Sequence, residues 1–468
     1  MNTAKAAFTR RWIPVFAFVL AVAMTAAYSL PQAQTAAKKA MTVDDYAKWR
    51  DIASREISGD GRWVAYVLQL TNTILAEAKP VLHLLNLETN VETTVNDASD
   101  PVFSSDSKWI AYQVDPGAAQ RARAARTGSG GAPSTQPAAP PATPPVAAPA
   151  EAPGTQQGQG QTGRGAAPAA IPPRRGELRN LETGAVRSWQ DIGTFAFAPT
   201  STHLVLRRRG AETASPTGQR GGGGPQAPVG GAGSASAAAG PRGQDAILLD
   251  LRTGSFQILG SVGDFAFNRS GELLAFTVDA AVKDGNGVFV FDTRNGRVTP
   301  LDNDAEIYSR LAWNDDGTAV AALKGSEVEK MRERNNVLVA FPDIPAALKD
   351  GAGAPLAVVL NPAKADGFPK GWIVSDRAAL TWSEDGKRVF FGTKEQVPAP
   401  DTTRKSTDEA ADVDVWNTGD ERVQSLQMVR AEQDRNFTFR QVFDVSAKRF
   451  VKLADETMRE LDVAPDGK

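Results

Sequence analysis

Two charged stretches hold the side chains best suited to recognise a charged ligand. They lie at 325–334 ("GSEVEKMRER") and 428–437 ("MVRAEQDRNF"). A pair of carboxylates can hold an ammonium group, and an arginine can hold a carboxylate through charge-assisted hydrogen bonds. The candidate contacts for the two termini of a peptide are Glu327, Glu329, Arg430, Glu432 and Arg435. The alternative is that both stretches, Glu333 included, are solvated faces with local ion pairs.

The sequence shows no pattern for nucleophilic catalysis. No serine has a glycine two positions before it and two positions after it, as a nucleophile elbow requires. The two histidines, His83 and His203, lie in apolar runs that read as strands. A serine triad needs a nucleophile, a base and a carboxylate that converge. We therefore expect structural histidines and no catalytic residue in this chain.

Metal and cofactor patterns are also missing. The acidic runs at 302–306 and 314–317 lack the spacing of a calcium loop, so turn chemistry explains them. The glycines at 221–224 are not followed by the Lys-Ser/Thr pair of a phosphate loop. The chain has no cysteine, and its 52 basic residues nearly balance its 54 acidic ones. This composition excludes disulfides and thiolate sites and gives no sign of a nucleic-acid partner. We expect no cofactor and no metal.

The N-terminus has the layout of an export signal. Basic residues up to Arg11 precede an apolar run from Trp12 to Ala27, and small or polar residues follow. The apolar run is shorter than the roughly 20 residues that span a bilayer. We expect residues 1–37 to be a cleaved signal peptide, which leaves no stable membrane anchor and a periplasmic or extracellular protein.

A short turn motif recurs along the rest of the chain. It has the form x-D-G-x, or a variant of it, and is followed by an apolar strand; the six copies are "ISGDGRWVAYVL" at 57–68, "FSSDSKWIAYQV" at 103–114, "FAPTSTHLVLRR" at 197–208, "FNRSGELLAFTV" at 267–278, "WNDDGTAVAALK" at 313–324 and "WSEDGKRVFFGT" at 382–393. A second hairpin pattern follows each copy, for example "LHLLNLETNVETTV" from residue 82. Asp-Gly and Thr-Gly supply the positive φ that tight hairpin turns demand. Two hairpins make a four-stranded unit.

The smallest spacing between copies, 57 to 103 and 267 to 313, suits a propeller blade. We therefore expect an all-β protein, a β-propeller of four-stranded blades over residues 57–468, with six complete blades and the start of a seventh at "VAPDGK". A lead-in at 38–56 precedes it, with a helix near 42–53 because Thr42 and Asp45 approximate a capping box.

Three long insertions interrupt the repeat between the second and third strands of a blade. Two of them, 116–175 and 210–243, are rich in Pro and Gly and are expected to be disordered. The third, 394–436, contains apolar residues such as Trp416 and Met428, so its later half is expected to be ordered. All three should leave the same face of the propeller.

The repeated hairpin resembles the N-terminal propellers of the prolyl oligopeptidase family of serine peptidases. "MTVDDYAKW" followed by "ISGDGRWVAYVL", and the stretch from Asp412 to Lys468, look like bacterial secreted members. The resemblance implies a C-terminal α/β-hydrolase domain with the serine triad as the partner of this propeller, and oligopeptides as substrates. It carries no catalytic residue onto this chain.

Two functions stay open from the sequence. The first is the substrate-gating propeller of a secreted serine peptidase. The second is a non-catalytic periplasmic propeller that binds a protein or peptide. Because the seventh motif stops at Lys468, where its strand should begin, we also expect the chain to be a fragment of a longer protein.

Overall fold

The structure is a computed structural model that describes residues 41–71, 73–128, 171–210, 243–349, 356–399, 418–420, 422–459 and 461–464. The chain divides into two compact units, Met1–Arg50 and Asp51–Lys468. Within those ranges no helix is both long and apolar enough to cross a membrane. The expected signal peptide and the seventh "DGK" turn lie outside the described residues.

The expected helix at 42–53 is wrong beyond its first turn. Helix α2 spans only Val43–Tyr46, and strand β1 begins at Arg50 and runs to Ile57. The Asp45 carboxylate does accept a hydrogen bond from the Thr42 backbone N–H at 3.1 Å, as the capping box requires. The helical spacing ends there because residues 50–57 pair with strand β2 and satisfy its edge.

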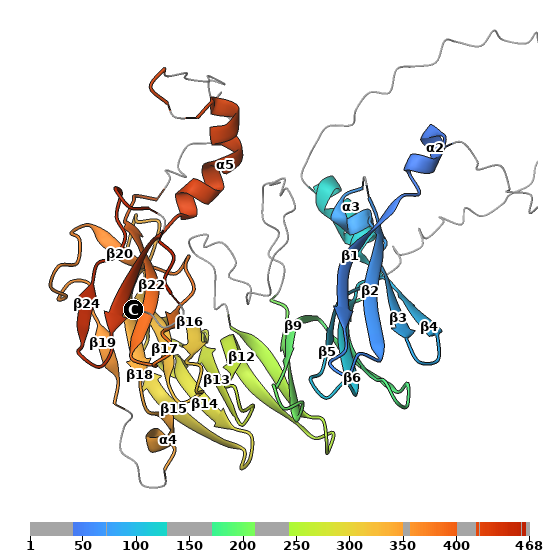
Figure 1. Cartoon of the computed structure of the whole chain (residues 1–468), viewed down its shortest axis with the longest axis horizontal. Helices are drawn as coiled ribbons and strands as arrows, with labels where there is room; N and C mark the ends of the chain where they lie inside the picture. The colour runs from blue at the N-terminus through green and yellow to red at the C-terminus, as the bar shows by residue number, and fades with distance from the viewer. Residues whose placement is uncertain are drawn as a thin grey trace, which may run out of the picture. The chain divides into compact units, whose positions relative to one another are not determined.

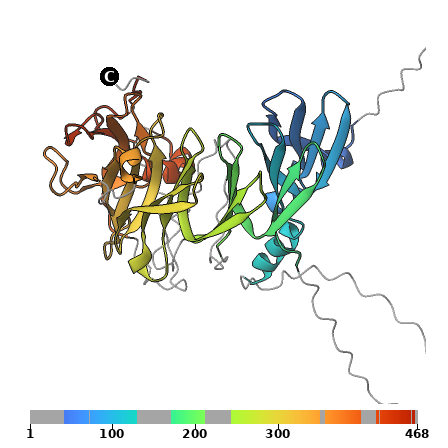
Figure 2. The same ribbon diagram turned by 90° about the horizontal axis from the view of Figure 1, so that it is seen from below.

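The first two sheets each consist of two antiparallel hairpins (Figures 1 and 2). The first contains β1, β2 (Trp63–Leu70), β3 (Val81–Asn86) and β4 (Val91–Asn96). The second contains β5 (Ala98–Phe103), β6 (Trp109–Val114), β7 (Arg175–Asn180) and β8 (Val186–Gln190). In both, strand order in the sheet follows chain order. These sheets confirm the four-stranded unit predicted from the paired hairpins.

The remaining strands form two larger sheets rather than four separate ones. The seven-stranded sheet contains β9 (Ile192–Phe197), β10 (His203–Arg208), β11 (Gln244–Asp250), β12 (Phe256–Phe267), β13 (Leu273–Val278), β14 (Gly287–Asp292) and β15 (Arg297–Asn303). The nine-stranded sheet contains β16 (Ile307–Trp313), β17 (Val320–Ser326), β18 (Asn335–Phe341), β19 (Val358–Leu360), β20 (Trp372–Ser375), β21 (Thr381–Trp382), β22 (Arg388–Glu395), β23 (Phe439–Asp444) and β24 (Arg449–Val451).

Two strands explain why six units give four sheets. Strand β12 continues through a register shift between Val262 and Phe265, so it ends one unit and begins the next. Strand β20 pairs with both β18 and β22 and joins the last two units. All six repeated turns nevertheless join adjacent antiparallel strands, from β1–β2 to β21–β22. The chain is thus an all-β protein of antiparallel sheets, consistent with a propeller-like fold, while six separate blades are not shown.

Apolar side chains from consecutive units pack into shared clusters. Leu82 and Leu84 of the first sheet pack with Ile110 and Tyr112 of the second, and all four are fully buried. The same arrangement recurs along the chain, ending with Ala321 of β17 beside Phe391 of β22. Burying such apolar surface contributes roughly 25 cal/mol per Å². The core therefore lies between successive units, including units that share one sheet.

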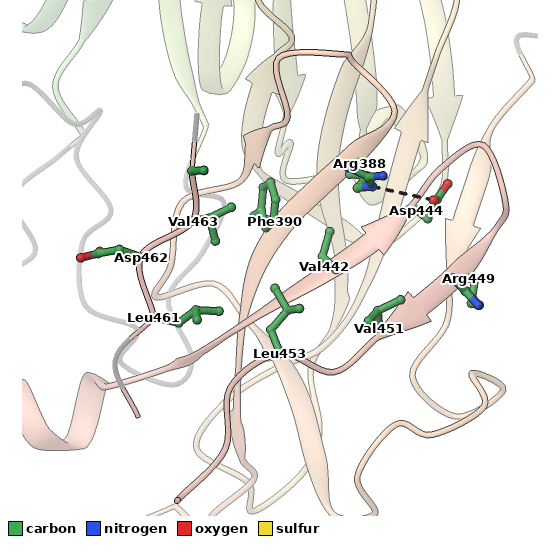
Figure 3. Close-up of a pocket in the computed structure, with 11 residues that line it drawn as sticks. Arg388, Phe390, Val442, Asp444, Arg449, Val451, Leu453, Leu461, Asp462 and Val463 are labelled. Carbon is green, nitrogen blue, oxygen red and sulfur yellow. Dashed lines mark ion pairs between the residues drawn. The ribbon is translucent and has the colours of Figure 1, made fainter. Parts of the chain in front are cut away.

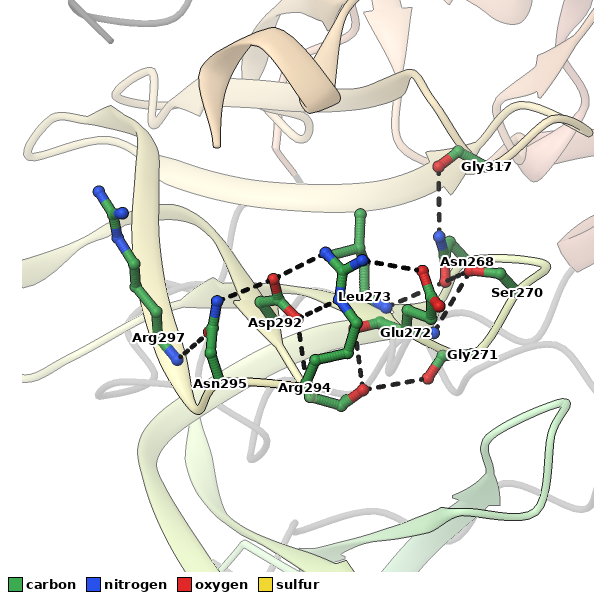
Figure 4. A network of polar contacts seen from close by, with 11 residues as sticks. Asn268, Ser270, Gly271, Glu272, Leu273, Asp292, Arg294, Asn295, Arg297 and Gly317 are labelled. Atoms are coloured by element: carbon green, nitrogen blue, oxygen red, sulfur yellow. Dashed lines mark hydrogen bonds and ion pairs between the residues drawn. The ribbon is translucent and has the colours of Figure 1, made fainter. Parts of the chain in front are cut away.

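Hydrogen bonds between successive turns reinforce this packing. The backbone N–H of Asp60 donates to Ser107 Oγ, and that of Asp106 donates to Ser201 Oγ, both at 3.0 Å. Further along, Asn268 Nδ2 donates to the Gly317 carbonyl at 3.3 Å (Figure 4). We call these contacts turn latches. Each ties the x-D-G-x turn of one unit to the turn of the next.

The insertions lie where the sequence predicts, between the second and third strands of their units. The first begins with helix α3 (Ala118–Gly128), so the expectation of disorder across 116–175 is wrong for this part. Arg121 forms an ion pair with Asp115 and donates to the Pro172 carbonyl at 2.9 Å, which ties the two ends of the insertion together. Residues 129–170 and 211–242 lie outside the described ranges.

The later half of the third insertion is ordered, as expected, and forms helix α5 (Gln424–Asn436). The shorter helical segments are α4 (Ile344–Ala347), η1 (Leu75–Glu77) and η2 (Lys283–Gly285).

Candidate functional site: a buried charged cluster

The two acidic candidates from the sequence lie in the segment after β17. Glu327 and Glu329 are exposed there, and Glu329 lies 3.9 Å from Lys330 in an exposed ion pair. Exposed pairs of this kind contribute little binding or stability because water screens them. Glu333, six residues beyond Glu327, behaves differently: its side chain is only 3% exposed.

The three candidates on α5, Arg430, Glu432 and Arg435, are exposed on that helix. No hydrogen bond or ion pair between described residues joins them to Glu327 or Glu329. One contact does connect α5 to the buried acid: Lys394 Nζ donates to the Arg435 carbonyl at 2.6 Å and lies 3.1 Å from Glu333 Oε1. The structure thus links the two charged stretches through Lys394 and the Arg435 backbone, rather than through the predicted side chains.

Lys394 and Glu333 belong to a larger group of charged side chains, which we call the charged cluster. Its members come from four separate parts of the chain, β16, the segment before β18, the turn after β20 and the end of β22: Arg310, Glu333, Arg334, Asp376, Arg377 and Lys394. Sequence reasoning missed all of them except Glu333. The pairing of β18 with β20 and of β20 with β22 brings these segments together.

Asp376 lies at the centre of the cluster. Its Oδ2 accepts from Arg334 Nη2 at 2.6 Å, and its Oδ1 is 4.0 Å from Arg377 Nε. The Arg310 side chain donates a hydrogen bond to the backbone carbonyl of Asp376. Arg377 Nε also lies 3.7 Å from Glu333 Oε1. Arg334 and Arg377 therefore flank the carboxylate of Asp376.

The electrostatics of Asp376 follow from these neighbours. Burial favours its neutral acid, but the hydrogen bond and charge of Arg334, together with the charges of Arg377 and Arg310, outweigh that effect. The pKa of Asp376 therefore lies below its ordinary value, and the carboxylate is ionised at neutral pH. Four cations and two carboxylates leave the cluster with a formal charge of +2.

A pocket of about 330 Å³ lies elsewhere, on the face of β22–β24 beneath residues 461–464 (Figure 3). Phe390 and Val442 line it, with the Arg388–Asp444 ion pair beside them. Phe390 occupies the strand position that Ala321 occupies in β17, and Ala321 is packed against the following unit. We therefore infer that these apolar side chains serve packing between units rather than the binding of a substrate.

The remaining candidates take part in local contacts. The acidic run at 302–306 lies around Lys324, whose Nζ is 3.2 Å from Asp302 and 2.6 Å from Asp304. His83 and His203 lie in strands β3 and β10, as predicted. His83 stacks on Tyr66 and contacts Glu92, and burial lowers the pKa of His203. Among the described residues no group of three or more metal-ligating side chains converges.

Comparisons with known proteins give only distant likenesses. No protein-family model and no curated protein matches the chain. Among solved structures, the β-propeller domain of the trilobed protease from Pyrococcus furiosus is 13% identical with a TM-score of 0.32, and the match covers 75% of this chain and 79% of that one. An acylaminoacyl peptidase from Pyrococcus horikoshii is 11% identical with a TM-score of 0.33, covering 74% of this chain and 43% of that one.

An oligogalacturonate lyase in complex with manganese is similar at the same level, with 12% identity, a TM-score of 0.34 and coverage of 86% of this chain and 76% of that one. Propeller domains of peptidases are thus among the structural neighbours at low identity. Because every TM-score is below 0.5, the description of the fold rests on the strand topology.

Proposed function

We propose that this chain is the substrate-gating propeller of an exported serine peptidase that hydrolyses oligopeptides, and that an α/β-hydrolase domain of the same polypeptide carries the triad. The observation that carries the proposal is the sequence of the segment from Asp412 to Lys468. This sequence resembles that of secreted members of the prolyl oligopeptidase family. The described part of the segment forms helix α5 and strands β23 and β24, and the two strands complete the sheet that holds the charged cluster.

Two further features support this function. Under this proposal the exposed side chains of Glu327, Glu329, Arg430, Glu432 and Arg435 are candidate contacts for a peptide, and the hydrolase domain supplies the nucleophile. The N-terminal signal layout supports a periplasmic or extracellular location.

A binding experiment tests the proposal. Fluorescently labelled peptides of 5 to about 20 residues are titrated into the purified chain, alongside the same sequences displayed as loops of a folded carrier protein. We expect the free peptides to bind and the carrier to be excluded. Binding of the folded carrier without binding of the peptides would instead support a propeller that recognises a protein partner.

A further inference from the structure

The charged cluster contains buried donors that no protein group satisfies. Arg334 is 9% exposed, and its Nη1 is buried without a hydrogen-bond partner. Arg377 Nε is likewise buried and unsatisfied, since its nearest carboxylate oxygen is 3.7 Å away. A buried N–H without an acceptor is expensive, and more so when it belongs to a charged group. Two such donors in one cluster can be satisfied by an acceptor that a ligand supplies.

The charge balance indicates which kind of acceptor would suit these donors. Four cations face two carboxylates, so one further anion would bring the cluster nearer to neutrality. Asp376 already occupies one edge of the Arg334 guanidinium through Nη2 and leaves Nη1 free. Planar guanidinium groups bind carboxylates with directed, charge-assisted hydrogen bonds.

The cluster also keeps a route to solvent. The side chains of Arg377 and Asp376 are 18% and 19% exposed, whereas Glu333 is 3% exposed. The Arg377 side chain is therefore partly open to solvent, while Glu333 and Lys394 form the closed side. Because Arg334 Nη1 and Arg377 Nε are themselves buried, a ligand reaches them when the Arg377 side chain moves aside. Lys394 already has two partners, Glu333 and the Arg435 carbonyl, and leaves the free donors to the arginines.

We propose that Arg334 and Arg377 form a carboxylate-binding site that recognises the C-terminal carboxylate of a peptide. This inference rests on the proposed function for the choice of a peptide, and on the two unsatisfied donors for the choice of a carboxylate. An acidic side chain carries the same chemical group, so the experiment distinguishes the two sources. This site is not the one predicted from the sequence, whose residues are exposed. Its cations are buried or partly buried and are held in place by Asp376 and Glu333.

The test compares three labelled peptides of one sequence: one with a free C-terminus, one amidated, and one amidated with an internal glutamate. We expect the purified chain to bind the free acid at least about tenfold more tightly than the amide, as a charge-assisted hydrogen bond in a part-buried site predicts. Preference for the internal glutamate over the free C-terminus would overturn the assignment to the peptide end.

The variants Arg334→Lys and Arg377→Lys keep the charge beside Asp376 but lose the planar donors. We expect each to weaken binding of the free acid about tenfold and to leave the amide unchanged. The matched control is Arg294→Gln, which removes an exposed arginine that is also paired with a carboxylate, at 2.9 Å from Asp292 (Figure 4). This control should bind all three peptides as the parent does.

A second measurement separates the site from the proposed function. N-acetylglycine should raise the Tm of the parent chain by about 2 °C at saturation, whereas N-acetylglycinamide and the Arg334→Lys variant should show no such shift. A shift without peptide binding would keep the carboxylate site and refute the peptide function. Peptide binding without any carboxylate preference would keep the function and refute the site.

Discussion

At the scale of single residues, Asp376 makes stability depend on pH. Its unfolded pKa is about 3.9 and its folded pKa is lower, so the folded chain binds fewer protons than the unfolded chain between these values. The stability that ionised Asp376 contributes is therefore present above about pH 4 and is lost as pH falls through the folded pKa. In Asp376→Asn this part of the acid dependence should disappear, as urea unfolding between pH 3 and 7 would reveal.

The same substitution should also lower stability at pH 7. Arg334 would keep its buried charge without a carboxylate, and breaking a buried pair from one side costs about 3 kcal/mol. Asp434→Asn is the control, because its ion pair with Arg422 is half exposed and should matter little. Equal losses in the two variants would contradict the role of the charged cluster.

Ser201 tests the turn latches. Its Oγ accepts the Asp106 N–H and the residue is 6% exposed, so Ser201→Ala should cost about 1 kcal/mol in the free energy of unfolding. Serine and alanine both carry a Cβ at the positive φ of 55°, so the backbone conformation costs the same in both. The substitution therefore measures the effect of the hydroxyl group alone. Ser255→Ala, in an exposed turn, should change stability by less than about 0.5 kcal/mol. An unchanged Ser201→Ala variant would mean that the latch contributes nothing.

At the scale of elements, tryptophans tie successive strands to one another. Trp313 Nε1 donates to the Ala266 carbonyl at 2.9 Å and Trp382 Nε1 donates to the Ala312 carbonyl at 3.2 Å, which links β12, β16 and β21. Trp313→Phe keeps an aromatic ring but leaves that carbonyl without its donor, so we expect a loss of about 1 kcal/mol. Thermal unfolding of Trp189→Phe in the outer strand β8 provides the comparison, and a loss there as large as in Trp313→Phe would contradict the proposed link.

The hairpins could be predicted because their turns demand a particular backbone. Gly61, Gly317 and Gly386 take positive φ in the x-D-G-x turns, and Ser107 and Ser201 take the same conformation in the copies without glycine. The helix at 42–53 could not be predicted correctly, since apolar spacing cannot reveal that β2 needs a partner strand. The merging of six units into four sheets also depends on tertiary pairing, through the length of β12 and the position of β20.

The charged cluster shows a similar limit. Arg310, Arg334, Asp376 and Lys394 come from segments far apart in sequence, and each looks like an ordinary surface charge in its own stretch. Only the pairing of β18, β20 and β22 buries them together. The sequence did direct attention to the neighbourhood, since Glu333 belongs to one of the two charged stretches and the Arg435 carbonyl to the other.

At the scale of the whole molecule, antiparallel units pack in succession, and the charged cluster lies between the last two. The insertions that follow the second strands of their units, including the one that ends in α5, lengthen the chain without altering the hairpins. Under the proposed function, these units select oligopeptides and a separate hydrolase domain cleaves them.

Fluorophosphonate labelling of the native polypeptide, isolated from its source cells with an antibody against residues 243–349, tests whether this propeller belongs to a serine peptidase. We expect one label per chain, mapped by mass spectrometry to a serine outside residues 1–468, and no label on the purified 468-residue chain. A native polypeptide that stays unlabelled beside a reactive control hydrolase, or a stoichiometric label within these 468 residues, would contradict the account.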